Sequence, residues 1–263
     1  MAVPQYDNGV HDMPIPGSTL EMPEFPPRVC SSGAQGRYLA SRLMRAVSAA
    51  ACVIAALGYS GAAASSCRTP EIRAESTHAD ISAYFAARKW HVITFVGYSG
   101  AEYEHPQQML AHAEHLLQPF SRDDTVVNIG ATKSGIGAVY ELAKKMGFRT
   151  SGIVSSLARD EGVEISDCVD LVFYVQDTQW GGIVPGSGRL SPTSQTIVDV
   201  STALFAIGGG DIARDEYLAT RRLGKRTEFV AAEMNHRIAR EKAARKGQPE
   251  PTDFRGTLGS EPQ

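Results

Sequence analysis

The chain has few cysteines, few tryptophans and almost no excess of charge. Among its 263 residues are four cysteines and two tryptophans, and the formal net charge is −3. This near balance leaves no basic surface of the kind that binds nucleic acid. Because the cysteines show no metal-type spacing, we expect neither a metal site nor a disulfide framework. Only Cys168 lies in sequence of core quality, where it is expected to be a small packing residue.

Two common nucleotide-binding fingerprints are also absent. The segment 130–137, GATKSGIG, lacks the G-x-G-x-x-G spacing of dinucleotide-binding proteins, and no clear acidic residue ends the next strand to hold a ribose. No loop closes with Gly-Lys-Ser or Gly-Lys-Thr, as a P-loop does. The sequence therefore predicts no bound cofactor of these classes.

The first third of the chain differs in character from the rest. Residues 1–43 hold six prolines and no periodicity, and we interpret them as a disordered or wrongly assigned leader. Residues 44–67 run from Met-Arg through AVSAAACVIAALGYSGAAA to SSC, a pattern typical of a secretory signal. Cys67 stands where bacterial lipoproteins are lipidated, although Ala64 replaces the usual leucine. The polar residues 68–89 would then form a tether.

Two localisations follow from this segment. Export, to the envelope as a lipoprotein or to the periplasm, is favoured by the placing of Met44 and by the abrupt change to polar residues after Cys67. A lipid would then be the only membrane anchor. An Ala-rich helix or leader attached to a cytosolic protein is the alternative.

From residue 90 to residue 246, short apolar runs alternate with helical patterns. We expect strands at 91–96, 125–129, 149–155, 170–175, 203–207 and 227–232, and helices at 106–118, 136–146, 191–201, 211–222 and 234–246. Short buried strands separated by helices predict an α/β fold with a mainly parallel, doubly wound, six-stranded Rossmann-like sheet and helices on both faces. Residues 247–263 are expected to be a flexible tail.

Glycine-rich loops follow three of these strands. In a doubly wound sheet such loops meet at the carboxyl edge, where helix N-termini favour phosphate. We therefore expect a nucleotide or sugar phosphate to bind there. The predicted ligand-binding residues are Gly97, Tyr98, Ser99, Gly100, Gly130, Ala131, Thr132, Gly135, Gly137, Gly208, Gly209 and Gly210. Trp180, in a loop after the fourth strand, is either a stacking surface for a base or an ordinary loop anchor.

Two longer segments resemble a known family. The segments 128–154, NIGATKSGIGAVYELAKKMGFRTSGIV, and 190–230, with IGGGDIARDE, are similar to the Lonely Guy or lysine-decarboxylase-like family and to the related DNA-processing protein A group. The resemblance implies a Rossmann-like fold, a possible homodimer, and hydrolysis of the N-glycosidic bond of nucleoside 5′-monophosphates by a glutamate and an arginine. Glu216 corresponds to that glutamate, or Asp215 in a neighbouring register.

The sequence departs from this family at several positions. Ile207 or Gly208 stands where the family has proline, and Ile212 and Ala213 replace its Gly-Thr. The arginine expected on the preceding helix is missing, and Arg189 and Arg214 are the nearby substitutes.

Three functions follow in order of preference. The first is binding of a nucleotide-like small molecule. The second is a phosphoribohydrolase that uses Glu216 with Arg189 or Arg214. The third is an envelope lipoprotein that acts as a scaffold without catalysis.

Overall fold

A computed structural model of the protein describes residues 67–260. The predicted leader and all of the predicted signal before Cys67 lie outside the described residues. No helix within the described range is both long and apolar enough to cross a membrane.

A seven-stranded parallel sheet forms the centre of the described part. Along the chain its strands are β1 (Glu71–Arg73), β2 (His91–Gly97), β3 (Thr125–Ile129), β4 (Arg149–Ser155), β5 (Leu171–Val175), β6 (Ala203–Ile207) and β7 (Arg226–Val230). Their order across the sheet is β1-β5-β4-β3-β2-β6-β7. The chain winds outward from β2 to β5, then returns to add β6 and β7 on the other side of β2. This confirms the doubly wound Rossmann-like fold, with β1 as one strand more than predicted.

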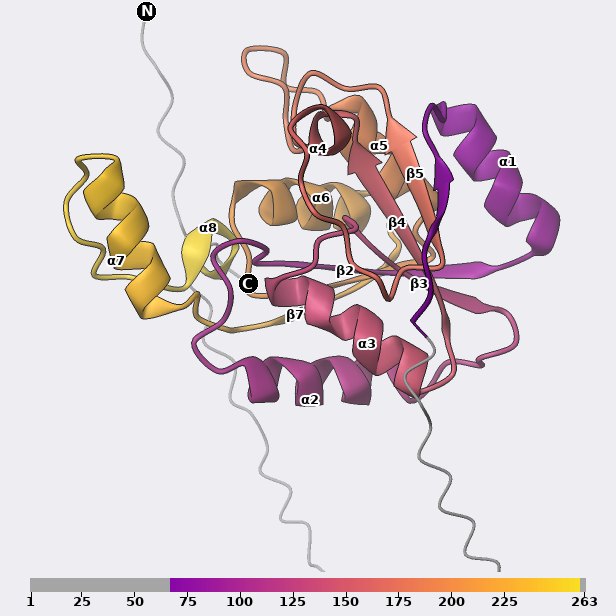
Figure 1. Ribbon diagram of the computed structural model, residues 1–263, viewed down its shortest axis with the longest axis horizontal. Coiled ribbons are helices and arrows are strands. Elements are labelled where there is room, and N and C mark those ends of the chain that lie inside the picture. The colour runs from indigo at the N-terminus through magenta and orange to yellow at the C-terminus, as the bar shows by residue number, and fades with distance from the viewer. Residues whose placement is uncertain (1–66, 261–263) are drawn as a thin grey trace, which may run out of the picture. The chain divides into compact units, whose positions relative to one another are not determined.

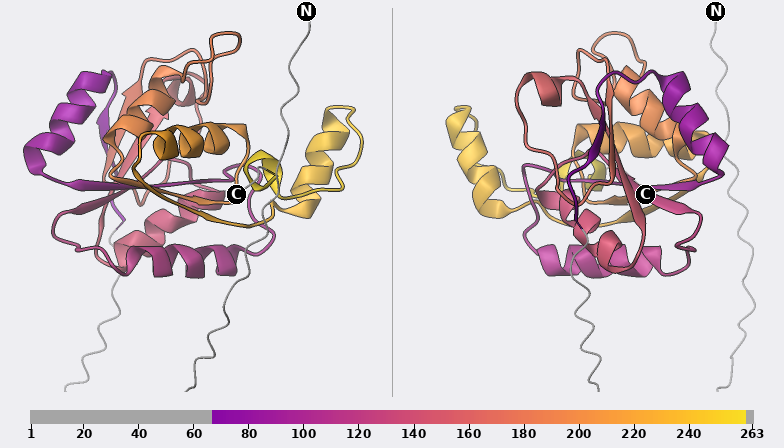
Figure 2. Two further views of the ribbon diagram at one scale, coloured as in Figure 1. Left: turned by 180° about the vertical axis from the view of Figure 1, so that it is seen from behind. Right: turned by 45° about the vertical axis from the view of Figure 1, so that its right-hand side comes forward.

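Helices cover both faces of the sheet. The helices α2 (Pro106–Leu117) and α3 (Ala138–Lys145) lie on one face, and α1 (His78–Arg88), α5 (Pro192–Val200) and α6 (Asp211–Arg222) lie on the other, as Figures 1 and 2 show. The 3-10 turn η1 (Gly135–Gly137) leads into α3, and α4 (Leu157–Asp160) follows β4. The last two helices, α7 (His236–Arg245) and α8 (Gly256–Gly259), lie beyond the carboxyl ends of β2 and β7 (Figure 1).

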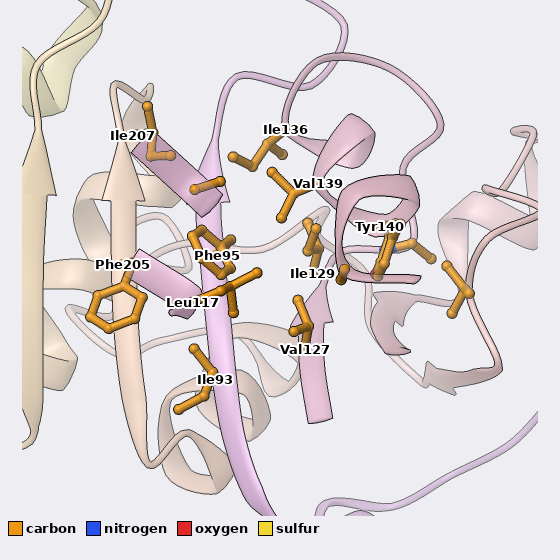
Figure 3. Packing of buried hydrophobic residues seen from close by; sticks show 14 of the residues in the cluster. Ile93, Phe95, Leu117, Val127, Ile129, Ile136, Val139, Tyr140, Phe205 and Ile207 are labelled. Atoms are coloured by element: carbon orange, nitrogen blue, oxygen red, sulfur yellow. The ribbon is translucent and has the colours of Figure 1, made fainter. Parts of the chain in front are cut away.

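Apolar side chains fill the space on both sides of the sheet. Phe95 of β2 and Val127 of β3 face α2 and α3, where they meet Leu117 and Val139 (Figure 3). Phe173 of β5 points to the opposite face and packs in the cluster formed with α1 and α5. Because both faces are buried, the strands read as continuous apolar runs rather than as alternating ones.

The helix starts follow from their capping residues. Ser191 caps α5 and accepts the backbone N–H of Ser194, with Pro192 in the first turn as predicted. Asn235 caps α7 by accepting the N–H of Ile238 at 3.0 Å. These caps fix the start of two helices that border the site.

Two segments predicted to lie outside the domain are part of it. The predicted tether, 68–89, instead forms β1, which pairs with β5, and α1, whose Ile81 is completely buried. The predicted flexible tail, 247–263, includes α8, where Leu258 is also completely buried. Both predictions are wrong because a few apolar residues within a polar segment bury enough surface to hold it against the sheet.

Cys67 and Cys168 form a disulfide that joins the start of the described chain to the loop before β5. The expectation that Cys168 is only a small packing residue is therefore wrong. The cysteine spacing, which indicates no disulfide framework, does not reveal a single bond between two cysteines 101 residues apart. A sulfur atom in a disulfide cannot carry a lipid thioether, so the structure also contradicts lipidation of Cys67. Disulfides persist in oxidising compartments, which favours export, and export itself stays a prediction.

Candidate functional site

The site lies where the winding of the sheet reverses, between β2 and β6. Loops leaving these two strands run to opposite faces of the sheet and leave a crevice at their carboxyl ends. A cavity of about 760 Å³ occupies this position. It is bordered by the ends of β2, β3 and β4, the first turns of α5 and α6, and one side of α7. Its size is within the range of about 300–1,000 Å³ common for small-molecule sites.

Four glycines, which have no side chain beyond the main chain, lie among the residues that line this cavity. Eight of the twelve predicted ligand-binding residues border it, namely Gly97, Tyr98, Ser99, Gly100, Gly130, Ala131, Thr132 and Gly210. A Cβ atom added at Gly130 or Gly210 would meet no atom within 4 Å. The backbone of Gly210 has φ −91° and ψ −158°, which other residues also adopt. These glycines therefore leave space at the cavity wall without being required by the fold.

The other four glycines of that set lie outside the cavity. A Cβ at Gly135 would lie 2.1 Å from the carbonyl oxygen of Tyr98, and one at Gly137 would lie 2.0 Å from that of Thr132. A Cβ at Gly208 would contact the Tyr98 ring, and one at Gly209 would be 2.6 Å from Ala213 Cβ. The assignment of these four glycines as ligand contacts is therefore wrong. They have no side chain because neighbouring segments of the loops pack closely against them.

Two tyrosines hold the loop after β2 in place. The hydroxyl of Tyr103 accepts the N–H of Tyr98 at 3.1 Å and donates to the carbonyl oxygen of Ile207 at 2.7 Å. The hydroxyl of Tyr98 turns away from the cavity and donates to the carbonyl oxygen of Arg255, next to α8. The loops after β2 and β6 are thus joined beneath the cavity.

Glu216 lies on the second turn of α6 and borders the cavity, although only 3% of its surface is exposed. Its Oε1 accepts a hydrogen bond of 2.6 Å from Ser194 Oγ. Burial raises the pKa of the Glu216 carboxyl to about 7, although the Ser194 hydrogen bond opposes the rise and the charge of Asp215 adds to it. A carboxyl with this pKa can give or take a proton near neutral pH.

Hydrogen bonds to Ser194 of α5 and Asp215 of α6 hold the loop that carries Trp180. Ser194 Oγ accepts the N–H of Gly182 at 2.7 Å while it donates to Glu216. Asp215 Oδ2 accepts the N–H of Ile183 at 2.9 Å. Asp215 therefore holds the loop in place. Of the two acids that could correspond to the family glutamate, Glu216 is the one that borders the cavity.

Thr193, next to Ser194, has an unsatisfied hydroxyl. The residue is 2% exposed and borders the cavity, and its Oγ1 has no hydrogen-bond partner within the described range. Its backbone N–H donates to Asp177 Oδ2 at 2.9 Å, which fixes the residue at the start of α5. A buried hydroxyl without a partner costs about 1–3 kcal/mol, so this atom favours a polar ligand group.

The two arginines proposed for catalysis do not reach the cavity. Arg214 points along α6, where it pairs with Asp215 at 2.9 Å and Asp211 at 3.4 Å. Arg189 lies on an exposed loop that does not border the cavity. The expected pairing of either arginine with Glu216 is therefore wrong. Arg214 pairs with Asp211 and Asp215 instead, and Arg189 is exposed to solvent.

Sequence reasoning missed several residues of the site. Thr193 and Ser194 come from the first turn of α5, Lys242 comes from α7, and Lys246 directly follows the last residue of α7. In the sequence, the charges of this segment resemble an ordinary solvated helix face. Lysines three or four apart on a helix share a face, but the sequence does not indicate what that face meets.

Comparisons with known proteins give distant likenesses. No family model and no curated protein matches the chain. The solved structure of TM1055, a structural-genomics target, is 17% identical over 52% of this chain and 72% of that chain, with a TM-score of 0.39. Two structures of the molybdenum cofactor carrier protein of Chlamydomonas reinhardtii are each 18% identical, with TM-scores of 0.38. They cover 53% and 60% of this chain, and 76% and 85% of their own.

Likenesses at this level assign no activity, so the function is argued from the site itself. The strand order and the parallel sheet carry the classification. The chain is a Rossmann-like α/β protein with the fold that its resemblance to the Lonely Guy family implies.

Proposed function

We propose that the protein binds a nucleotide or a nucleoside phosphate in the cavity at the carboxyl ends of β2 and β6. The observation that carries this proposal is the wall of the cavity. Gly130 and Gly210 leave open main chain there, and the buried hydroxyl of Thr193 has no partner among residues 67–260. Such a wall suits a ligand that makes close backbone contacts and supplies a polar group.

The parts of the cavity suit the parts of such a ligand. No acceptor in the described part of the chain receives the backbone N–H groups of Ser99 and Gly100, which are therefore available to phosphate oxygens. Glu216 and Thr193 offer one acceptor and one hydroxyl to a sugar. Trp180, with 43% of its surface exposed, offers a ring to a base.

The first experiment measures binding to the wild-type protein and to glycine variants. We expect nucleoside 5′-monophosphates or diphosphates to raise the melting temperature, because ligand at a hundredfold excess over its Kd adds about 2.7 kcal/mol to stability. Gly210→Ala and Gly130→Ala add a methyl group at the wall without strain. Each should reduce affinity by about tenfold or more in isothermal titration calorimetry, with the unliganded stability unchanged.

Gly209→Ala is the matched control. Gly209 has a φ of 136° and its new Cβ would crowd Ala213, so this variant should lose more than about 1 kcal/mol of stability. If no nucleotide stabilises the wild-type protein, the proposal is wrong and the scaffold function gains support. Unchanged affinity in both cavity variants would place any nucleotide elsewhere.

A second candidate function is hydrolysis of the N-glycosidic bond. Glu216 favours it, since a buried carboxyl that borders the cavity can stabilise positive charge that develops on a ribose. Neither Arg189 nor Arg214 supports this carboxyl, so the residues that would orient the substrate differ from those of the family that the sequence resembles.

Release of free base from nucleoside monophosphates tests this candidate. An enzyme should release base, and Glu216→Gln should lower kcat by at least about a hundredfold while the nucleotide still binds. Binding without any release of base would leave a binding protein. Equal turnover by the wild-type protein and Glu216→Gln would exclude Glu216 from catalysis.

A further inference from the structure

Helix α7 brings positive charge to one end of the cavity. Lys242 and Lys246, one turn apart, both border it. Lys242 Nζ donates a hydrogen bond of 2.6 Å to the carbonyl oxygen of Gly100, which holds the ammonium group over the loop after β2. An ammonium group has three N–H donors, so two remain for another acceptor.

The charges at this end of α7 are unbalanced. Nearer its start, Arg237 pairs with Glu241, and Arg240 pairs with Glu250 at 2.7 Å. Neither Lys242 nor Lys246 pairs with a carboxylate within residues 67–260. Burial, together with the charges of Arg245 and Lys246, lowers the pKa of Lys242, while Glu102 opposes this. A bound anion would relieve this repulsion.

Another part of the cavity wall, formed by the Trp180 loop and the start of α6, is apolar. Trp180 and Ile212 border the cavity there, with 43% and 40% of their surfaces exposed. Their loops lie against each other, since a Cβ at Gly181 would come within 3.0 Å of Ile212. Exposed large apolar side chains at the wall of a cavity favour an apolar ring of the ligand.

The N-terminus of α6 is a poor place for the anion. Asp211 is the first residue of this helix, so a carboxylate already stands at its positive end. Arg214 pairs with Asp211 at 3.4 Å but also with Asp215, and so does not leave a positive charge there. An anionic ligand would meet repulsion at α6 and attraction at α7.

We propose that Lys242 and Lys246 bind the phosphate of the ligand against the Ser99–Gly100 loop, and that Trp180 and Ile212 bind its ring. The inference rests on the proposed function and gives the orientation of the ligand in that cavity. It assigns α7 as the source of phosphate specificity. The ligand class is a phosphorylated nucleoside in preference to the free nucleoside.

Calorimetry with matched ligand pairs tests this orientation. The probes are the four common nucleoside 5′-monophosphates and the four corresponding nucleosides, with the wild-type protein. We expect the tightest monophosphate to bind at least about tenfold more tightly than its nucleoside, because the nucleoside lacks the phosphate that would accept charge-assisted hydrogen bonds from the two lysines. The difference between the two affinities should shrink as salt is added, because Lys246 is exposed and Lys242 is only partly buried.

Lysine variants connect this preference to α7. Lys242→Gln and Lys246→Gln should each weaken monophosphate binding by about tenfold and leave nucleoside binding unchanged, and Lys242→Arg should restore part of the loss. Arg237→Gln is the matched control, because it removes the same charge from the same helix at a position that does not border the cavity, and it should leave both affinities unchanged. Trp180→Ala should weaken both ligands by the same factor.

The outcomes separate the orientation from the proposed function. If the wild-type protein binds the monophosphates and Gly210→Ala does not, but the lysine variants keep full affinity, the orientation alone is wrong. Equal affinity for a nucleoside and its monophosphate would overturn it as well. If the wild-type protein binds none of the eight probes, the orientation and the proposed function fall together.

Discussion

At the scale of single residues, the site depends on which groups are left unsatisfied. The hydroxyl of Ser194 accepts from Gly182 and donates to Glu216, while the neighbouring Thr193 hydroxyl has no partner within the described range. The position of Glu216 on α6 was predictable from the glycine motif before it. Its hydrogen bond to Ser194, 22 residues away, was not, because such a contact depends on how two helix starts meet.

The pKa of Glu216 predicts how stability depends on pH. Its carboxyl titrates near pH 7 in the folded protein and near pH 4.5 when exposed, so the folded state holds the proton more tightly. The contribution of Glu216 to the free energy of unfolding is therefore complete below pH 4.5, and it is lost as the pH rises through about 7. We expect the free energy of unfolding to fall by at most about 3 kcal/mol between these two pH values because of this group.

Urea unfolding between pH 4.5 and pH 8 measures this effect. Glu216→Gln keeps the shape of the side chain and cannot ionise, so its stability should lack that fall with pH. The difference between the two proteins isolates Glu216 from other titrating groups. Parallel curves for the two proteins would show that the carboxyl has an ordinary pKa.

At the scale of elements, the sequence predicts strands and helices well where periodicity is strong. The bounds of β3, β4, β6 and α6 agree with the predicted 125–129, 149–155, 203–207 and 211–222. Besides α1, in which only Ile81 and Phe85 of eleven residues are buried, and the four-residue α4, the misses are β1, with three exposed residues, and α8, with four residues. Such short elements carry no periodic signal, and they exist because β5 and the loop after β6 give them partners.

The Cys67–Cys168 disulfide predicts a dependence on redox conditions at this scale. It holds the segment leading to β1 against the loop before β5. It closes a loop of 101 residues, and removing such a bond costs about 2–5 kcal/mol.

Urea unfolding with and without dithiothreitol measures the contribution of this bond. The reductant should lower the stability of the wild-type protein and leave a Cys67→Ser/Cys168→Ser variant unchanged. The double variant itself should resemble the reduced protein. Equal stability of the oxidised and reduced wild-type protein would mean that this bond does not hold β1 in place.

At the scale of the whole molecule, topology places the site more firmly than any motif. Reversal of winding between β2 and β6 opens a crevice at their carboxyl ends whatever the loops contain. The predicted sheet therefore located the cavity correctly. The contribution of α7 was not predictable, since it requires the chain to turn back after β7 toward the loop after β2.

The C-terminal turn has a consequence for the order of events during synthesis. Leu258 donates its backbone N–H to the carbonyl oxygen of Gly209, and Tyr98 donates its hydroxyl to that of Arg255. The loops after β2 and β6 are thus held by Arg255 and Leu258, which are synthesised more than a hundred residues after β2. A nascent chain can assemble most of the sheet while it is still being translated, but its pocket reaches final form only after Leu258 has left the ribosome.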